Sequence, residues 1–416
     1  MSSRTLSSPT TSEPATPGGR SGKRNPIQAG TSAVRSLRHE SFDYLLLAGT
    51  TITLVIFGVI MVFSSSTVTS LVSSGSPFTT ASRQAMYAFM GVALMLVISR
   101  RSERFLMRSA WWVLGVGVLL QMVVVATPLG VTVAGNTNWL SIGGLQLQPS
   151  ELIKLGLVLW LGMMVTRKQD HLNDFRMGML PILIGSGAAI FAVLLGGDLG
   201  TEVVIAAFVF GALLLTGIRL RMFVIPLAVV VVGFLVVALS SSSRLARITA
   251  FFSGANTSDY LSSGWQLQHG MYALANGGLF GVGLGNSTAK WSWLPAADND
   301  FIFAIIGEEL GLIGAIAVLG LFALLCYSLL RIFRGATTPF GRTTSAAVIV
   351  WIMFQATANV AVVLGMFPVL GVPLPFISSG GTALISNLAS IGIVLSVARH
   401  TAANPDAEPW QIKSEP

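Results

Sequence analysis

The chain has 416 residues, of which 53% are hydrophobic and only 10% are charged, and its formal net charge is +8. Soluble domains usually carry about 25% charged residues, so this composition excludes an ordinary soluble protein and predicts a polytopic membrane protein with spans of about 20 apolar residues. The single cysteine, Cys326, excludes an internal disulfide and a cysteine-based metal cluster.

The first segment, residues 1–40, is rich in Ser, Thr, Pro, Gly, Arg and Lys and shows no apolar periodicity. Such a segment cannot bury enough surface to offset the entropy of ordering. We therefore expect a disordered basic cytoplasmic tail, and not a secretory signal, because about forty polar residues precede the first apolar stretch. Residues 401–416 are expected to form a second, short cytoplasmic tail.

Hydropathy predicts an all-α fold with about ten transmembrane helices between residues 41 and 400. The helices are expected at residues 44–63, 84–99, 109–127, 150–166, 178–196, 200–218, 222–240, 301–330, 343–366 and 380–398. One connection, residues 242–299 between the seventh and eighth helices, is far longer than the others. Long connections are usually functional or disordered, and the aromatic, amide and Gly-rich composition of this one favours a packed extracytoplasmic element.

The positions of the basic residues explain the net charge. With the N-terminus inside, twelve of them fall in short inner connections and four in outer ones. The inner residues are Arg100, Arg101, Arg104, Arg108, Arg167, Lys168, Arg176, Arg219, Arg221, Arg331, Arg334 and Arg342, and the outer residues are Arg83, Arg244, Arg247 and Lys290. This asymmetry is typical of a membrane protein with both termini in the cytoplasm. The charge therefore indicates topology and a tail near anionic lipid, and no nucleic acid partner is expected.

Eight acidic residues fall outside the tails and the inner connections, and charge at membrane depth is costly enough to make each a functional hypothesis. They are Glu151, Asp198, Glu202, Asp259, Asp298, Asp300, Glu308 and Glu309. Asp298 and Asp300 stand at the outer mouth of a predicted span, with Glu308 and Glu309 two turns deeper. Helix capping explains Asp300 alone, whereas adjacent like charges raise each other's pKa and suit a proton acceptor or an ion-coupling site.

Two other segments carry charges near helix ends. Glu151 and Lys154 are spaced i,i+3 in a first helical turn, which fits either a local ion pair or part of a polar substrate groove. Asp198 is predicted to cap the helix expected at residues 200–218.

Glycines at positions 277, 278, 281, 283 and 285 precede Lys290. Exposed amides with a lysine can cradle a phosphate, although tight packing also explains the glycines. A diphosphate would suit Lys290 together with Arg247.

The segment before the last span carries three prolines, followed by Ser378, Ser379, Gly380 and Gly381. Broken backbone at membrane depth is tolerated only where it lines a polar cavity or is buried in protein. We expect this outer loop to close over the same site as the acidic residues.

At these residues the chain resembles the SEDS family of cell-wall polymerases, and its division (FtsW) branch more than its elongation (RodA) branch. The resemblance covers residues 43–400 and rests on five ordered motifs, QPSELIKL, DLGT, GLFGVGLGNSTAK, LPAADNDFIFAIIGEELG and PLPFISSGGT. It implies a peptidoglycan glycosyltransferase that polymerises lipid II on the outer face of the cytoplasmic membrane, by inverting hexosyl transfer from an undecaprenyl-diphosphate-linked donor. An apolar groove between spans would hold the polyprenyl tails.

The resemblance also implies roles for single residues. Asp300 matches the essential acid of the family and is the expected general base, and Asp298 is an expected secondary acid that could share its proton or assist a divalent cation, Mg²⁺ or Mn²⁺. No other cofactor is expected. Residues expected to bind the substrate or its diphosphate are Arg247, Lys290, Gln266, Glu151, Lys154 and Ser378. The chain departs from the family's motifs at Asn138, His269, Gly270, Ala296, Asp298 and Ser379.

The expected partners are a class B penicillin-binding protein of the FtsI type, because the sequence holds no Ser-x-x-Lys transpeptidase domain, and activating division proteins at the septum. Two other interpretations stay open: a transporter that flips lipid II across the membrane, and a non-catalytic division scaffold. A flippase needs charges near the bilayer midplane, whereas this sequence concentrates them at the outer mouth.

Overall fold

The structure, a computed structural model, describes residues 26–133, 136–142, 145–239, 245, 263–291, 293–404 and 406–412. Three residues singled out from the sequence, Arg244, Arg247 and Asp259, lie outside these ranges, as do residues 1–25 of the polar N-terminal segment.

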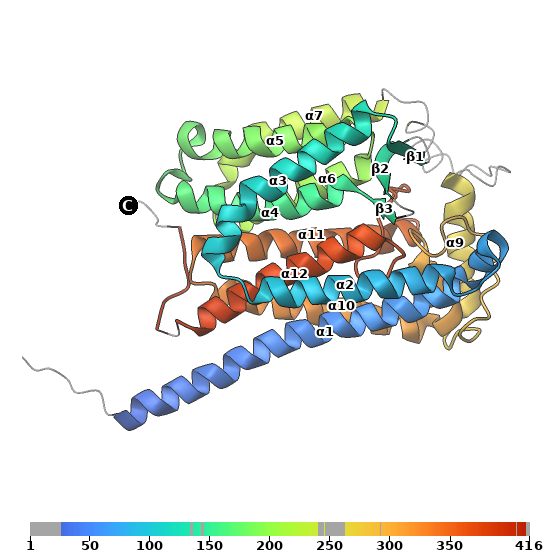
Figure 1. Cartoon of the computed structure of the whole chain (residues 1–416), viewed down its shortest axis with the longest axis horizontal. Coiled ribbons are helices and arrows are strands. Elements are labelled where there is room, and N and C mark those ends of the chain that lie inside the picture. Colours follow the sequence, from blue (N-terminus) through green and yellow to red (C-terminus); the bar gives the residue numbers. More distant parts are fainter. Residues whose placement is uncertain are drawn as a thin grey trace, which may run out of the picture.

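The described chain forms a bundle of long helices that run side by side along one axis (Figure 1). Eight described helices are long and apolar enough to cross a membrane. They are α1 (Pro26–Ser74), α2 (Thr79–Ser99), α3 (Glu103–Ala126), α4 (Pro149–Arg167), α5 (Leu180–Leu194) together with the π-helical turn Phe175–Met179 before it, α10 (Ile302–Gly335), α11 (Pro339–Val363) and α12 (Gly381–Ala402). Two shorter apolar helices, α6 (Leu199–Leu215) and α7 (Val224–Leu239), occupy the sixth and seventh predicted positions. The prediction of an all-α polytopic fold is confirmed.

Helix α1 begins earlier than the first predicted span. Residues 26–40 were assigned to the disordered tail, and in the structure they are helical and continuous with the apolar part of α1. Extending a formed helix costs less than nucleating a new one, so a polar segment can continue the helix of the adjoining span.

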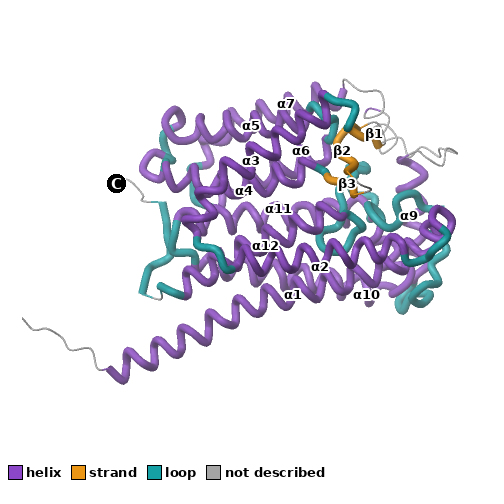
Figure 2. Tube along the Cα trace, viewed as in Figure 1, coloured by secondary structure: helices purple, strands orange, loops and turns teal. Residues whose placement is uncertain are grey.

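One end of the bundle, here called the outer end, carries a small antiparallel sheet and helix α9 (Ser263–Gly277), which lie to the right in Figure 1 (Figure 2). The strands β1 (Gly130–Val133), β2 (Asn136–Ile142) and β3 (Leu145–Leu147) lie in that order, with Val131 opposite Trp139 and Leu140 opposite Leu147. The sheet was not predicted, because its strands have three to seven residues and lie in a connection between spans. A sheet of this size needs packing support, which includes a 3.0 Å bond from the Thr137 amide to the Gly196 carbonyl.

Helix α9 lies in the long connection and packs on the first turns of α10. A Cβ atom on Gly270 would lie 2.9 Å from the Phe301 ring, and one on Gly277 would lie 1.9 Å from the Gly307 carbonyl oxygen. Small residues let helices approach closely where no water drives association. Residues 263–277 therefore form a packed element at the outer end, as expected for this connection.

The centre of the bundle is formed by α4, α11 and α12, most of whose residues are buried, whereas α2, α3 and α10 bury one side only. Gly156 of α4 lies so close to α3 that a Cβ atom would be 2.7 Å from the Leu114 backbone. The inner connections contain short turns, η1 (Gln169–His171), the π-helical η2 (Phe175–Met179) and η3 (Leu220–Phe223). The C-terminal segment folds back on this end, where the Trp410 amide donates to the Ala336 carbonyl.

Candidate functional site

Asp300 lies in a turn immediately before α10, at the outer end of the bundle. The Ala296 carbonyl accepts bonds from the Asn299 amide at 3.1 Å and the Phe301 amide at 3.3 Å, which closes the turn. The Asn359 side chain on α11 donates to the Asp300 carbonyl at 2.8 Å. These bonds hold the backbone of Asp300, while its carboxylate faces the loop after α11, where a Cβ atom on Gly371 would lie 3.8 Å from Oδ2.

Asp298 is joined to the same loop. The Ser379 amide donates to the Asp298 carbonyl at 2.9 Å, and the Ser379 hydroxyl bonds the Asp298 carboxylate. Burial raises the pKa of Asp298 above its ordinary value, against the opposing effects of hydrogen bonds from its own backbone and from the Ser379 side chain. Burial of this carboxyl group, two residues from Asp300, favours its protonated form.

Ser378 ties the two segments together through its hydroxyl. The Oγ atom donates to the Asn299 carbonyl at 2.7 Å and accepts from the Leu374 amide at 2.7 Å. The Ser378 carbonyl accepts from the Gln84 side chain on α2 at 3.1 Å. Because its hydroxyl donates and accepts within the protein, the structure gives Ser378 a part in positioning the Asp300 turn.

Glu151 and Lys154 form the predicted local ion pair in the first turn of α4, with Nζ and Oε1 2.7 Å apart. The pair is buried. The Ser386 hydroxyl on α12 bonds the Glu151 carboxylate at 2.5 Å, and the Lys154 ammonium lies 4.9 Å from the centre of the Trp351 ring on α11. The spacing in sequence predicted the pair, whereas the two partners on α11 and α12 could not be predicted from it.

Asp198 caps α6, as predicted, through a 3.0 Å bond from the Thr201 amide to Oδ1. It also accepts from the Gln148 side chain at 3.1 Å. Burial raises the pKa of Asp198, the bonds from Thr201 and the charge of Lys154 lower it, and the charge of Glu151 raises it. Asp198 therefore belongs to the same polar cluster as the Glu151–Lys154 pair. The predicted capping role did not indicate this proximity.

The loop between α11 and α12, residues 364–380, connects this cluster with Asp300. The Trp351 indole that Lys154 faces donates to Gln355 at 2.9 Å, and the Gln355 amide donates to the Pro373 carbonyl at 2.9 Å. Gly200 at the start of α6 also abuts the loop, since a Cβ atom there would lie 2.3 Å from the Leu370 carbonyl oxygen. Gln355 and Asn359 were missed, although two amides spaced i,i+4 in the apolar segment FQATANV could have indicated a polar face.

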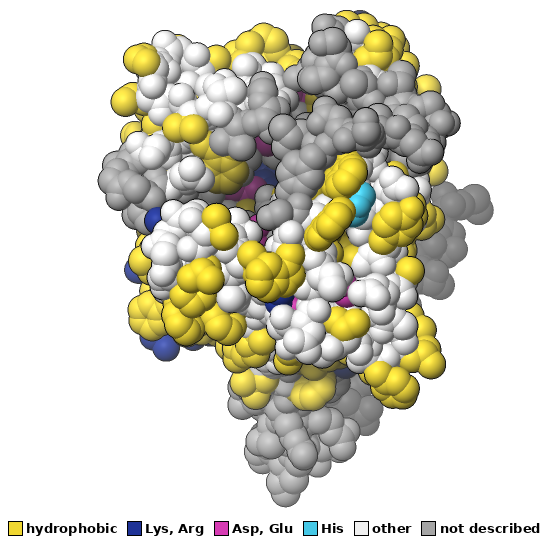
Figure 3. All heavy atoms as spheres, turned by 90° about the vertical axis from the view of Figure 1, so that its right-hand side faces the viewer, with side chains coloured by type: hydrophobic (Ala, Val, Ile, Leu, Met, Phe, Trp, Pro, Cys, Tyr) yellow, Lys and Arg dark blue, Asp and Glu magenta, His cyan; other side chains and the backbone are white. Residues whose placement is uncertain are grey.

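The outer end is hollowed where these elements meet. Figure 3 looks onto this end and shows acidic and basic side chains recessed below the surrounding surface. Charge at the bottom of a recess is shielded from bulk water, which strengthens its effect on a bound ligand.

Lys290 lies away from this arrangement, in a second buried cluster. Its ammonium pairs with Glu309 at 3.2 Å, and Ser64 on α1 donates to the same carboxylate at 2.6 and 2.7 Å. Glu308 accepts from the Thr288 amide at 3.0 Å and also bonds the side chains of Asn276, Ser287 and Thr288. The sequence suggested one cluster of four carboxylates, but Glu308 and Glu309 bind the glycine-rich segment about 12 Å along α10 from Asp300.

The glycine-rich segment repairs a break in α10. Gly311 has φ 69° and ψ −168°, so the helical bonds across it are lost. The carbonyls of Glu308 and Glu309 accept instead from the amides of Val282 and Gly283, and the amides of Leu312 and Ile313 donate to the carbonyls of Gly278 and Leu279. Backbone groups freed at membrane depth must find such partners. The glycines thus serve close backbone pairing, one of the two interpretations of the sequence.

The remaining predicted site residues are Gln266 and Arg247. Gln266 is half-buried on α9, next to Trp265. Arg247 lies outside the described residues, so its predicted contact with a diphosphate stays a prediction.

A family model described as a cell cycle protein, for FtsW, RodA and SpoVE, matches residues 44–403. The chain belongs to the FtsW/RodA/SpoVE family. It is 35% identical to the probable peptidoglycan glycosyltransferase FtsW of Mycobacterium tuberculosis over 83% of this chain, and it spans 66% of that protein. It is 34% identical to stage V sporulation protein E of Bacillus subtilis over 86% of this chain and 97% of that one. A solved chain of a peptidoglycan synthase complex that coordinates polymerization and crosslinking superimposes with a TM-score of 0.69 at 25% identity, covering 85% of this chain and 97% of that chain.

Two departures from the FtsW/RodA/SpoVE motifs are in contact with each other. Asp298 and Ser379 are hydrogen-bonded through both backbone and side chain. Asn138, a third departure, is buried beside Gln121 of α3 at 3.3 Å, under the turn that precedes Asp198. These substitutions therefore alter the supports of the site and leave Asp300 in place.

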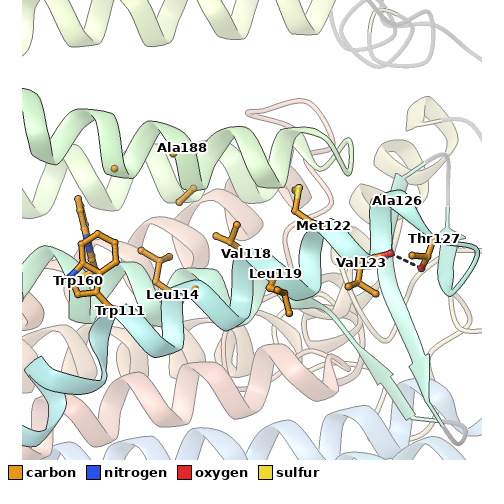
Figure 4. A pocket seen from close by; sticks show the side chains of 13 residues that line it. Trp111, Leu114, Val118, Leu119, Met122, Val123, Ala126, Thr127, Trp160 and Ala188 are labelled. Atoms are coloured by element: carbon orange, nitrogen blue, oxygen red, sulfur yellow. Dashed lines mark hydrogen bonds between the residues drawn. The ribbon is translucent and has the colours of Figure 1, made fainter.

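An apolar groove runs along the membrane-facing side of this FtsW/RodA/SpoVE family chain, between α3, α4 and α5 (Figure 4). Its volume is about 700 Å³. Figure 4 shows Trp111 and Trp160 at one end and Ala126 and Thr127 at the other, where α3 reaches the outer end. Apart from the Thr127 hydroxyl and the two indoles, the lining is apolar, as was expected of a site for a polyprenyl tail.

The described residues place no three His, Cys, Asp or Glu side chains together as a metal site. Asp298 and Asp300 would supply only part of the oxygen shell that Mg²⁺ or Mn²⁺ requires. The requirement for a divalent cation stays a prediction.

Proposed function

We propose that this chain is a peptidoglycan glycosyltransferase that polymerises lipid II on the outer face of the cytoplasmic membrane during division. The observation that carries the proposal is the placement of Asp300, whose backbone is held by Asn359 while its carboxylate faces the loop after α11 at the hollowed outer end. The names of the relatives and the likeness to a synthase complex support it.

In the proposed reaction the 4-hydroxyl of the acceptor lipid II sugar attacks the anomeric carbon of the growing strand. Asp300 takes the hydroxyl proton as the new carbon–oxygen bond forms. The bond from the anomeric carbon to the diphosphate breaks with inversion, and undecaprenyl diphosphate leaves. A carboxylate fixed by its backbone suits this role, because a general base must lie within hydrogen-bond reach of the proton it removes.

The two lysines of the site need separate roles. Lys154, near Asp198 and paired with Glu151, lies in the polar cluster joined to the loop over Asp300 and is the described cation best placed to face a departing diphosphate. Lys290 lies with Glu309 in the second cluster, away from the loop over Asp300, so we assign it to holding the glycine-rich segment on α10. Arg247 is retained as a proposed second contact.

We further propose that the groove along α3 and α5 receives part of a polyprenyl tail, and that a class B penicillin-binding protein and division activators bind this chain at the septum. The synthase complex, which couples polymerization to crosslinking, supports a transpeptidase partner. Both termini are proposed to be cytoplasmic, which cysteine labelling at exposed Asn404 from either side of the membrane would test.

The decisive experiment uses purified protein and lipid II, with the product separated on a gel. Asp300→Ala and Asp300→Asn should lower strand synthesis by at least about 100-fold, the scale of losing a general base, while thermal stability and partner binding are kept. Asp406→Asn, an exposed carboxylate of the C-terminal segment, is the matched control. A normal yield of strands from Asp300→Ala would contradict the assignment of Asp300 and favour the flippase or scaffold interpretation. An assay of head-group translocation in liposomes distinguishes those two.

A further inference from the structure

An exposed aromatic face lies on α9 and on the turn before Asp300, and the proposed reaction does not use it. The face consists of Trp265, His269 and Trp293, with Tyr272 at its edge. Trp293 and Tyr272 expose 56% and 58% of their surface. Single exposed rings are common in this chain, whereas exposed aromatic side chains gathered in one patch indicate a binding surface.

The planes of the three rings are nearly parallel. The rings of Trp265 and His269 are stacked with centres 3.9 Å apart and an interplanar angle of 18°. The Trp293 ring is nearly parallel to both, at 8° and 16°, with its centre 6.5 and 6.1 Å away. A third ring stacked on the pair would lie at unequal distances from its members, so Trp293 lies beside the pair and widens the face.

Hydrogen bonds fix this face before any ligand arrives. The Trp265 indole donates to the Trp293 carbonyl at 2.8 Å, which joins α9 to the turn. The His269 Nδ1 atom lies 3.0 Å from the Trp265 carbonyl oxygen. A preorganised surface loses little entropy on binding. His269 is also a position where the chain departs from its family's motifs, so the stack is a feature of this sequence.

The face adjoins the turn that holds Asp300. Gly270, the residue after His269, packs against Phe301, the residue after Asp300. Trp293 begins the short segment that leads to Asp300, and the Leu294 amide in that segment donates to the Ala289 carbonyl. A polymer that leaves the proposed catalytic site can therefore reach the aromatic face within a few sugar units.

The chemistry of the face favours a saccharide. Aromatic rings carry negative potential on their faces, and the axial C–H bonds of a pyranose present a flat, weakly positive surface to them. Side-chain amides stand beside the rings, since Gln268 donates to the Tyr272 hydroxyl at 2.7 Å. Lipid chains and protein helices are better matched by aliphatic grooves. An interfacial membrane anchor, the other common use of exposed Trp and Tyr, does not require parallel, stacked rings or a histidine.

We propose that the face formed by Trp265, His269 and Trp293 binds pyranose units of the growing glycan strand and keeps it on the enzyme between additions. The inference rests on the proposed polymerase function for the identity of its ligand. It goes beyond that function by assigning a strand-binding surface outside the catalytic turn.

Binding is tested apart from catalysis, in the full chain carrying Asp300→Asn, with a soluble β-1,4-linked N-acetylglucosamine tetramer and saturation-transfer NMR or calorimetry. Trp293→Ala should weaken tetramer binding about 5-fold, the effect of one lost aromatic contact. Trp293→Phe, which keeps a ring, should stay within about 2-fold. Trp291→Ala is the matched control, because Trp291 is 63% exposed in the same turn and has no ring contact with the face.

Polymerisation supplies the second readout, in protein with Asp300 intact. Trp293→Ala should shift the strands made from lipid II to shorter lengths, while Trp291→Ala and Trp293→Phe give the parental length distribution. Equal effects of Trp293→Ala and Trp291→Ala would overturn the proposal and indicate an interfacial anchor, and so would a parent that does not bind the tetramer. If Trp293→Ala selectively loses tetramer binding but the chain with Asp300 intact makes no strands, the saccharide face is supported and the proposed polymerase function is contradicted.

Discussion

Two carboxyl groups at the outer end have different surroundings although they are two residues apart. The backbone of Asp300 is held by Asn359, and its carboxylate faces Gly371. The carboxyl group of Asp298 is buried against Ser379, and burial raises its pKa. Different surroundings allow neighbouring carboxyl groups to take different protonation states at one pH. Burial therefore favours the protonated form of Asp298, while Asp300 is the proposed proton acceptor.

The raised pKa of Asp298 predicts a pH dependence of stability. The folded chain holds this proton to higher pH than the unfolded chain, whose aspartates titrate near about 3.9. Between those two pKa values the folded state binds more protons, so stability should fall as pH rises. Asp298→Asn removes this contribution. The melting temperature of Asp298→Asn relative to the parent should therefore increase as pH is raised from about 4 to 7.

Thermal unfolding in one detergent at several pH values measures this difference. Asp406→Asn serves as the control, since Asp406 is exposed. A difference between Asp298→Asn and the parent that stays constant with pH would contradict the predicted burial of a proton at this position.

Single contacts were predictable from the sequence only when both partners were local. The i,i+3 spacing predicted the Glu151–Lys154 pair, and the position of Asp198 before a helix predicted its cap. The contact of Ser378 with the Asn299 carbonyl spans 79 residues, and no local pattern indicates such a bond. The expected role of Ser378 in binding substrate came from a motif, whereas its hydroxyl positions the turn.

At the scale of elements, the break in α10 is the feature on which the outer end depends. Four backbone bonds between residues 278–283 and 308–313 replace the helical bonds lost at Gly311. The Lys290–Glu309 pair and the bonds to Glu308 fasten the same segment through side chains. These contacts fix the first turns of α10 against α9 and α1. The Asp300 turn, which immediately precedes α10, is held with them.

This pairing predicts different costs for two substitutions in one segment. Gly281 and Gly278 both have positive φ, at 80° and 53°, but a Cβ atom on Gly281 would lie 2.2 Å from the Glu309 carbonyl oxygen, and one on Gly278 would meet nothing within 4 Å. Gly278→Ala should cost about 1 kcal/mol, the strain of a left-handed alanine. Gly281→Ala should cost about 2 kcal/mol more than Gly278→Ala, because the backbone at Gly281 must move away from the Glu309 carbonyl.

Melting temperatures and strand synthesis of the two variants check this prediction together. Gly281→Ala should lose both more stability and more activity than Gly278→Ala. Equal costs would mean that the glycine-rich segment does not pair with α10 as described.

Hydropathy located the helices because burial in lipid requires long apolar runs, and it could not locate the break within α10. Gly311 lies in an apolar run like the glycines of unbroken helices, and only contact with residues 278–283 makes its conformation tolerable. The clustered glycines before Lys290 did signal close backbone approach. Their partner could not be identified from the sequence, because it lies on another element.

At the scale of the whole molecule, the described charges and the groove together suggest how a lipid-linked substrate is held. Asp198, Asp298, Asp300 and the Glu151–Lys154 pair lie at helix starts or turns of the outer end. A flippase would need charge deeper in the bilayer, where Glu309 is paired with Lys290 and Glu308 is bound to the glycine-rich segment. The groove follows α3 from Trp111 to Thr127, about 24 Å of helix. That length covers most of a hydrocarbon core of about 30 Å, and one wall is α5, which ends shortly before Asp198.

Filling this groove should therefore affect long-tailed substrates in particular. Ala188 lines the groove on α5, and Ala188→Phe would occupy part of its 700 Å³. Ile184→Phe adds a ring on the same helix at a side chain that is 63% exposed and outside the groove lining, and is the matched control. If several isoprene units lose their contacts, kcat/KM for lipid II with its full undecaprenyl tail should fall about 10-fold in Ala188→Phe. The same variant should use a short-tailed lipid II analogue as well as the parent does, because that tail does not extend along the groove. Steady-state polymerisation of both substrates in nanodiscs measures the ratio, and an equal loss with both tails would show that the groove does not hold the substrate.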